Sequence, residues 1–496
     1  WEKFINWFKK LFGEEEKETS GKILLVVKNS LLPELQSDLD VWKQDIKNEY
    51  NYEVVQKTIS AETPEEIKDF VKAEYDSGNL KGVLFIGGIP TVMFQDKSLT
   101  VEGSTAIYPS DKYYIDLSNE CFSALISKEE CNSLTIDIAC YKFENEQRCN
   151  DFINKKSLFW VARLTTPDYN ARNLNGGNNL SLLSLYFKRN HDYRTGTELY
   201  EHKMLAFLPM LDSDFPSEES EIYRNRFLNQ GSDVEKLNYY SGPVDLINTP
   251  EEYKFALEKK PYEYVFYNGH GSPNSAQGIT SEELAIIKSK SLFYQLSSCS
   301  NGNFIEGDYL AGNYLFQGEG LLVTAMNKPS SGVVQFPSTE SFLLDNGFNF
   351  ADVFQRNGPV LHIYGDPTLS LTKRTNSNVE IKNIDLGQIK IPDNINDFYY
   401  KDFNVTIKNL GDEKINIMIM KSGETGTNFD EIGSFLHINA SLSFPISIQP
   451  SEEIIFPSKL LVHGSLQPVK FSVNYNFYSN AKNPQPNFSI SGELVK

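Results

Sequence analysis

Two short apolar runs, each followed by a turn of small residues, constrain this chain more than any other feature. The run Tyr264–Tyr267 leads to His270 between two glycines, and the run Leu292–Leu296 leads to Cys299 between two serines. Such runs, bounded by Gly or Ser, are typical of strands buried in a parallel sheet. Because catalytic groups of open α/β sheets lie beyond the carboxyl ends of strands, we expect both side chains at one edge of a sheet.

The spacing of these two side chains favours neighbouring strands. Cys299 follows His270 by 29 residues, about the length of one strand–helix–strand crossover. An imidazole beside a thiol can take its proton as the sulfur attacks, which makes the pair a candidate nucleophile and base. The backbone N–H groups of Gly271 and Cys299 are candidate donors to an oxyanion, and a glycine permits close approach to a substrate carbonyl.

Length and charge limit the classes of function. The 496 residues predict three or four domains, and the net charge of −19 argues against a nucleic-acid partner, since such proteins are usually basic. No apolar stretch is long enough for a membrane-spanning helix. The chain begins at Trp1 without a signal sequence, so we expect a processed product, and attachment to a membrane or surface through a missing upstream segment stays open.

The cysteines divide into a cluster and a single residue. The cluster contains no CxxC pair, which argues against zinc, and comprises Cys121, Cys131, Cys140 and Cys149. Two disulfides in an oxidising compartment are the favoured interpretation, and four thiols in a cytosolic loop are the alternative. If the cluster forms disulfides, Cys299 is the remaining thiol, as a nucleophile requires.

The chain divides into four regions by pattern. Residues 1–20 are an amphipathic leader and linker, which packs on the protein's own body or on a membrane or partner. Residues 21–160 read as an N-terminal α/β subdomain with a Cys-rich insertion, and residues 161–374 as the catalytic α/β subdomain. Residues 379–496 alternate apolar and polar positions in short runs, which predicts an immunoglobulin-like β-sandwich.

Several of these segments also resemble one family. The motifs YNGHG and QLSSCSNGNF, together with KILLVV, GVLFIGGIP, YPSDKYYIDL, FWVARLTT and LHIYGDPTLSL in the same order, are similar to landmarks of gingipain-type cysteine peptidases. The resemblance implies the fold class: a caspase-like, two-subdomain parallel-sheet catalytic body followed by the immunoglobulin-like domain. It implies hydrolysis of peptide bonds through a thioester, with no cofactor required for the chemistry.

The resemblance also assigns roles to residues. His270 would be the general acid/base, Cys299 the nucleophile, and Gly271 and Cys299 the oxyanion-hole donors. A carboxylate beyond an earlier strand would orient the imidazole; we expect that strand over Leu205–Leu211, ending at Asp212, with Asp214 as the alternative. The loop 327–338 would wall the substrate pocket but lacks the expected Trp, and offers Asn327, Ser330 and Ser331.

Two further features follow from the resemblance. The acidic run Glu218–Glu221 lies where an acidic residue would recognise basic substrate side chains, although a solvated loop is the simpler interpretation. Structural calcium is common in the family, and loops 111–116 and 212–222 are the candidates, without a spacing that identifies ligands.

The sequence therefore predicts a secreted or surface-attached cysteine endopeptidase acting on protein or peptide substrates, with cleavage after basic residues as one specificity. Two alternatives stay open. A transpeptidase or sortase-like processing enzyme would use the same Cys–His pair with an amine in place of water. A non-catalytic surface binding protein would retain the fold alone.

Overall fold

The computed structural model describes the greater part of the chain. The described residues are 21–101, 104–118, 124–125, 140–142, 159–168, 177–196, 202–228, 238, 240, 242–329, 340–341, 344, 349–354, 361–371, 379–394, 397–412, 415–425, 436–438, 446–463, 468–479 and 488–496. The amphipathic segment 1–20 lies outside this part. So do three of the clustered cysteines and the side chain of Cys140, so the disulfide prediction stays untested.

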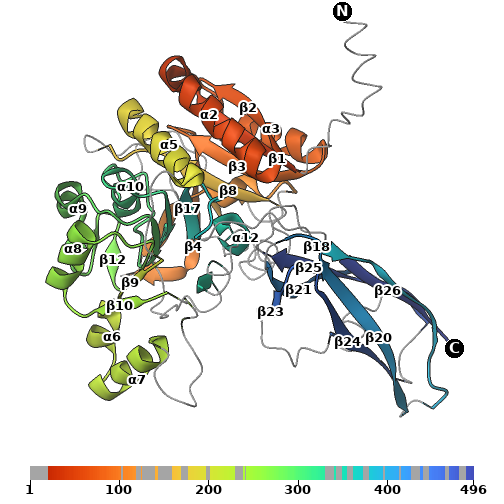
Figure 1. Ribbon diagram of the computed structural model, residues 1–496. Coiled ribbons are helices and arrows are strands. Elements are labelled where there is room, and N and C mark those ends of the chain that lie inside the picture. The colour runs from red at the N-terminus through yellow and green to blue at the C-terminus, as the bar shows by residue number, and fades with distance from the viewer. Residues whose placement is uncertain are drawn as a thin grey trace, which may run out of the picture.

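One ten-stranded sheet runs through the whole α/β body (Figure 1). Its order is β10-β9-β11-β15-β16-β17-β8-β3-β1-β2, and the neighbours are parallel except for β16 and β17. The strands are β1 (Gly21–Lys28), β2 (Tyr52–Ile59), β3 (Leu80–Ile86), β8 (Trp160–Leu164), β9 (Met204–Phe207), β10 (Val244–Ile247), β11 (Tyr264–Asn268), β15 (Phe293–Ser297), β16 (Leu322–Met326) and β17 (Leu361–Gly365).

Apolar runs form these strands because helices cover both faces of the sheet. In β1, Ile23, Leu25 and Val27 pack into the core beneath helix α2, while Leu24 and Val26 pack into a second core with helix α3 (Pro64–Asp76). A strand buried on both sides reads as a continuous apolar run, as parallel sheets require. Helices α2 (Leu32–Tyr50) and α5 (Leu180–Thr195) lie side by side over one face (Figure 1).

The two halves of the sheet join through a narrow contact. Strands β8 and β17 pair at one position, Tyr364 opposite Arg163, whereas β8 pairs with β3 along its whole length. The expected boundary at residues 160 and 161 therefore falls inside the start of β8, a strand of the N-terminal half. A small additional sheet precedes it, formed by β4 (Val92–Val101), β5 (Ser104–Ser110), β6 (Ala124–Leu125) and β7 (Cys140–Lys142).

A buried ion pair reinforces this junction. Arg163 donates from Nε and Nη2 to the two carboxylate oxygens of Asp111 at 2.8 and 2.5 Å, and from Nη1 to the carbonyl of Ile89 at 2.8 Å. Burial alone would raise the pKa of Asp111, but the Arg163 guanidinium outweighs that effect and holds it below its usual value. Bidentate geometry of this kind fixes orientation as well as charge.

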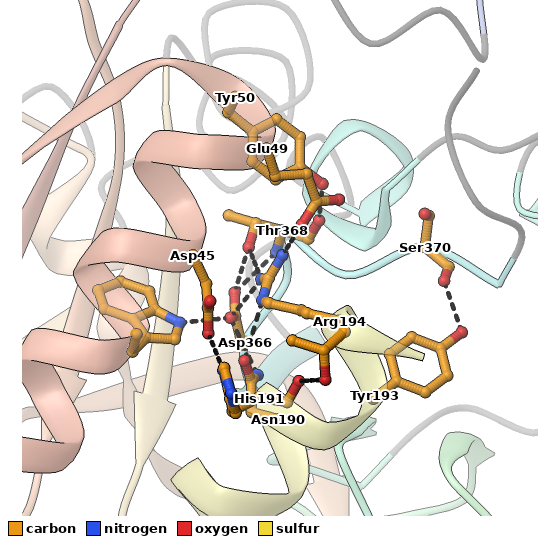
Figure 2. A network of polar contacts seen from close by, with 12 residues as sticks. Asp45, Glu49, Tyr50, Asn190, His191, Tyr193, Arg194, Asp366, Thr368 and Ser370 are labelled. Carbon is orange, nitrogen blue, oxygen red and sulfur yellow. Dashed lines mark hydrogen bonds and ion pairs between the residues drawn. The ribbon is translucent and has the colours of Figure 1, made fainter. Parts of the chain in front are cut away.

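A second buried ion pair ties three separate segments together (Figure 2). Asp366, just after β17, is fully buried and accepts hydrogen bonds from Arg194 at 2.7 Å and from the Trp42 indole at 2.6 Å. Thr368 donates from its backbone and its hydroxyl to the other oxygen of Asp366. Burial raises the pKa of Asp366, yet Arg194 and these donors together hold it below its usual range. The C-terminal end of α5 is thereby locked to α2 and β17.

Replacing Asp366 by alanine should destabilise the fold strongly. The change leaves the Arg194 guanidinium buried with Glu49 as its remaining carboxylate partner, and loss of one member of a buried pair costs about 3–5 kcal/mol. Urea unfolding measures this cost as a lower midpoint at constant slope. The control is Asp192→Ala, which removes an exposed pair with Lys188 on the same helix and should cost about 0.5 kcal/mol or less. Equal midpoints for the two variants would contradict the argument.

The C-terminal residues form two sheets around one apolar core. The strand orders are β18-β20-β24-β22 and β19-β26-β25-β21-β23. The shared core contains Val405, Phe456 and Leu460 from the first sheet and Ile415 and Leu494 from the second. The strands are β18 (Val379–Ile381), β19 (Ile384–Lys390), β20 (Phe398–Asn409), β21 (Ile415–Thr425), β22 (Leu436–Ile438), β23 (Ile446–Ile448), β24 (Glu453–His463), β25 (Val469–Ser479) and β26 (Phe488–Val495). The more specific immunoglobulin-like assignment stays a prediction.

Among the described helices, none combines the length and the apolarity that crossing a bilayer demands.

Candidate active site

His270 and Cys299 follow the ends of adjacent parallel strands. Strand β11 pairs with β15 in register from Tyr264 opposite Phe293 to Asn268 opposite Ser297. Each reactive residue comes two positions after the last pair, and the Gly269 N–H donates to the Ser297 carbonyl at 3.2 Å. The two side chains therefore begin from equivalent points on the same sheet edge, as the sequence spacing predicts.

A carboxylate contacts the imidazole, and it belongs to Asp214. Nε2 of His270 lies 3.0 Å from Oδ1 of Asp214, and both side chains are partly exposed, at 54% and 34%. Hydrogen bonds from the Ser213 hydroxyl, and then from His270, hold the pKa of Asp214 below its usual value. With Nε2 engaged in this way, Nδ1 is the ring nitrogen available to exchange a proton with a thiol.

Asp212, the first choice from sequence, lies elsewhere. Its Oδ2 accepts a hydrogen bond from Nη2 of Arg224 at 2.7 Å, away from His270. The expected strand over Leu205–Leu211 is confirmed only as far as Phe207, where β9 ends; the rest of the prediction is wrong, because Pro209 opens the short helix α6 (Pro209–Asp214). Proline fixes φ and lacks an N–H, so it favours the first turn of a helix over a central strand. Residues two apart on a helix point to nearly opposite sides, which separates the two carboxylates.

The acidic run is helical. Glu218, Glu219 and Glu221 lie in α7 (Ser217–Phe227), with the first two in its opening turn, where the helix dipole stabilises negative charge. Arg224 of the same helix holds Asp212. This arrangement supplies a structural reason for the acidic composition of the segment.

Asn327 is buried and faces inward. Its side-chain amide bonds to Nε2 of His362 at 2.8 Å and to the carbonyl of Pro109. The predicted contact with substrate does not fit this placement, because the residue after β16 turns toward β17 instead. Burial lowers the pKa of His362 to about 4, and the neutral ring is the form that can accept a hydrogen bond at Nε2. Ser330 and Ser331 lie outside the described residues.

Gly271 lies in close contact with the turn that carries Cys299. It begins the strand β12 (Gly271–Ser272), and a Cβ built there would lie 2.2 Å from Oγ of Ser298 and 2.9 Å from Nδ2 of Asn301. The turn that carries Cys299 therefore touches the backbone directly after His270. The Cys299 thiol is half-buried and the His270 imidazole is exposed.

The loops suggested for calcium hold other structures. Asp111 begins a short 3-10 helix and gives both carboxylate oxygens to Arg163, and residues 212–222 form parts of α6 and α7. Within the described ranges, no group of three or more His, Cys, Asp or Glu side chains is arranged to hold a metal ion. Structural calcium therefore stays a prediction.

Sequence reasoning missed two residues of this site. Ser300 adopts the left-handed conformation, with φ of 57°, and its N–H donates to the Lys328 carbonyl. Asn301 is fully buried and reaches across to the chain after His270. The dipeptide Asn301–Gly302 is a turn signal in the sequence, but it carries no information on which distant segment the side chain bonds.

Comparisons with known proteins leave the family open. No family model matches the chain, and a search of curated proteins finds no match. A solved structure described as "Structure of Protease" aligns at 12% identity over 97% of this chain and 100% of its own, with a TM-score of 0.46. A PapD-like domain of human CEP192 aligns at 8% identity over 26% of this chain and 91% of its own, with a TM-score of 0.18. The CupB6 tip adhesin of Pseudomonas aeruginosa aligns at 12% identity over 28% of this chain and 50% of its own, with a TM-score of 0.17. Similarity at this level assigns neither fold nor activity, so the function is argued from the site.

Proposed function

We propose that this chain is a cysteine endopeptidase of the gingipain-like, caspase-fold type. The proposal rests on the placement of three residues beyond the ends of three neighbouring strands, β9, β11 and β15. Cys299 and His270 follow neighbouring strands in register, and Asp214, carried by the helix after β9, contacts His270 at 3.0 Å. A nucleophile, a base and a group that orients the base are the parts of a triad, recognised by geometry and not by chain order.

The proposed reaction has two stages. The Cys299 sulfur attacks the scissile carbonyl carbon while its proton passes to His270, and the C–N bond breaks as His270 protonates the leaving amine. A water molecule then attacks the thioester and gives its proton to His270. The C–S bond breaks, which releases the acid, and His270 returns its proton to the sulfur so that the thiol is restored. Asp214 stabilises the imidazolium formed in each stage, and the Gly271 and Cys299 N–H groups are the proposed oxyanion donors.

The expected surroundings of this enzyme stay part of the proposal. Secretion or surface attachment is consistent with the clustered cysteines outside the site, and protein or peptide substrates with a partly exposed catalytic pair. Cleavage after basic residues would draw on the acidic α7 beside Asp214.

A peptide library incubated with the wild-type chain, reductant and calcium tests the proposal. We expect defined cleavage products by mass spectrometry, and faster alkylation by iodoacetamide at Cys299 than at the other four cysteines. An added amine tests the transpeptidase alternative, because amide products would then appear beside the free acids. Absence of cleavage together with ordinary alkylation of Cys299 would leave only a binding protein of this fold.

A further inference from the structure

Asn301 joins the two loops that carry the proposed catalytic pair. Its Nδ2 donates to the carbonyl of Ser272 at 2.5 Å and to the carbonyl of Ser275 at 3.0 Å. These carbonyls belong to the two strands of the small hairpin that directly follows His270, β12 and β13 (Ser275–Ala276). One side chain, two residues beyond Cys299, thus holds both arms of the histidine hairpin.

The cysteine side of this contact is itself fixed. The Ser300 N–H donates to the Lys328 carbonyl at 3.0 Å, and the Gly302 N–H donates to the Met326 carbonyl at 2.7 Å. Both acceptors lie at the exit of β16, so the turn after Cys299 is anchored to the neighbouring strand. The Asn301 carbonyl also accepts from Ala311 at 3.0 Å. Backbone hydrogen bonds at Ser300, Asn301 and Gly302 therefore hold in place the turn that carries the Asn301 side chain.

The hairpin packs closely against the turn that follows Cys299. Gly271 lies so close to Ser298 and Asn301 that even a methyl group would collide with them. A hairpin released from Asn301 would shift relative to the turn. Such a shift alters the spacing of imidazole and sulfur, and displacements of about 1 Å cost reacting groups about 10²-fold in rate.

We propose that Asn301 is a positioning residue that sets the separation of the His270 imidazole from the Cys299 sulfur. We call the two hydrogen bonds from Asn301 to the Ser272 and Ser275 carbonyls the clamp. The inference rests on the proposed function, because it relates this clamp to the proposed catalytic pair. The two hydrogen bonds of the Asn301 side-chain amide go to backbone carbonyls of the hairpin and not to the imidazole or the sulfur, so Asn301 acts through the hairpin. Its two acceptors are backbone carbonyls, so a substituent without a donor cannot replace it.

Asn313 supplies a matched control. It is buried to the same degree and its Nδ2 also donates to two backbone carbonyls, those of Asp308 and Tyr309, at 3.1 and 3.0 Å. Those carbonyls lie at the start of its own helix α10 (Leu310–Phe316) and belong to neither strand of the histidine hairpin, whose turn meets this helix start through the Pro273 carbonyl and the Leu310 N–H. The two residues therefore share burial and bonding but differ in what they hold.

The experiment compares Asn301→Ala and Asn313→Ala by peptide turnover, melting temperature and the pH dependence of Cys299 alkylation. For Asn301→Ala we expect kcat to fall by about 10²-fold with little change in KM, because geometry and not binding is lost. Alkylation of Cys299 should become slower across the pH range, because a displaced imidazole assists the thiol less. Asn313→Ala should lower the melting temperature and leave both kcat and the alkylation profile near wild type.

His270→Ala separates the two proposals. If His270→Ala changes neither turnover nor alkylation, the proposed function is wrong. If it changes both while Asn301→Ala keeps the wild-type kcat and profile, the clamp is wrong and the function stands. Should Asn301→Ala fail to fold, Asn301→Ser keeps one donor. It should show a smaller kcat loss with the same slowing of alkylation, and an unchanged alkylation profile would overturn the clamp.

Discussion

Peptide cleavage should fall by about 10⁴-fold or more when Cys299 is replaced by alanine, because no other group can form the thioester. His270→Ala should cause a loss of similar size, since the thiol then lacks a base and the leaving amine lacks an acid. Asp192→Ala is the control. It removes an exposed pair with Lys188 on α5 and belongs to neither loop of the site, so turnover should stay near wild type.

The double variant provides the sharper measurement. Residues that act as one catalytic unit are strongly non-additive, so Cys299→Ala with His270→Ala should lose no more than either single change. Single-turnover kinetics on one peptide from the library measures the rates of the wild type, the two single variants and the double variant under the same conditions. Multiplicative losses would mean that the two residues act independently, which would remove the basis of the proposed mechanism.

Asp214→Asn should reduce kcat/KM by about 10²–10⁴-fold, whereas Asp212→Asn should leave it nearly unchanged. An amide in place of the Asp214 carboxylate cannot stabilise the imidazolium and favours the wrong ring tautomer, which in a well-studied triad costs about 10⁴-fold. The partial exposure of this pair places the expected loss in the lower part of that range. Asp212 pairs with Arg224 on a surface-facing helix and does not contact His270.

The two substitutions form a matched set, since both change an aspartate of α6 to its isosteric amide. Peptide turnover across pH measures each, and melting temperatures show whether either helix end unfolds. A large loss for Asp212→Asn with a small one for Asp214→Asn would restore the assignment favoured by sequence, and would require α6 to turn in the active state.

Local signals in the sequence predicted much of the fold. Thr63, Pro64 and Glu66 predict a helix start, and the structure has the full capping box with Pro at the first position. The apolar runs before His270 and Cys299 form adjacent parallel strands in register. These features depend on neighbours along the chain or on burial of a whole strand, so the residue pattern records them directly.

Other features depend on contacts between distant segments. The apolar run Leu205–Leu211 predicts one strand, and although Pro209 is a local signal against a central strand, it does not show which way the following helix α6 turns its two aspartates. The inward turn of Asn327 depends on His362, which is 35 residues away. A contact between side chains of distant loops does not change the pattern of residues next to either one in the sequence, so the sequence does not reveal it.

The sequence by itself determined that a thiol and an imidazole follow two buried strands, because apolar run, turn and spacing are local properties. Only the tertiary structure decided which aspartate meets the imidazole and which asparagine holds the two loops together. Those choices are made by the rotation of one short helix and by the close approach of Gly271 to the Cys299 turn, and both arise from packing between segments far apart in the chain.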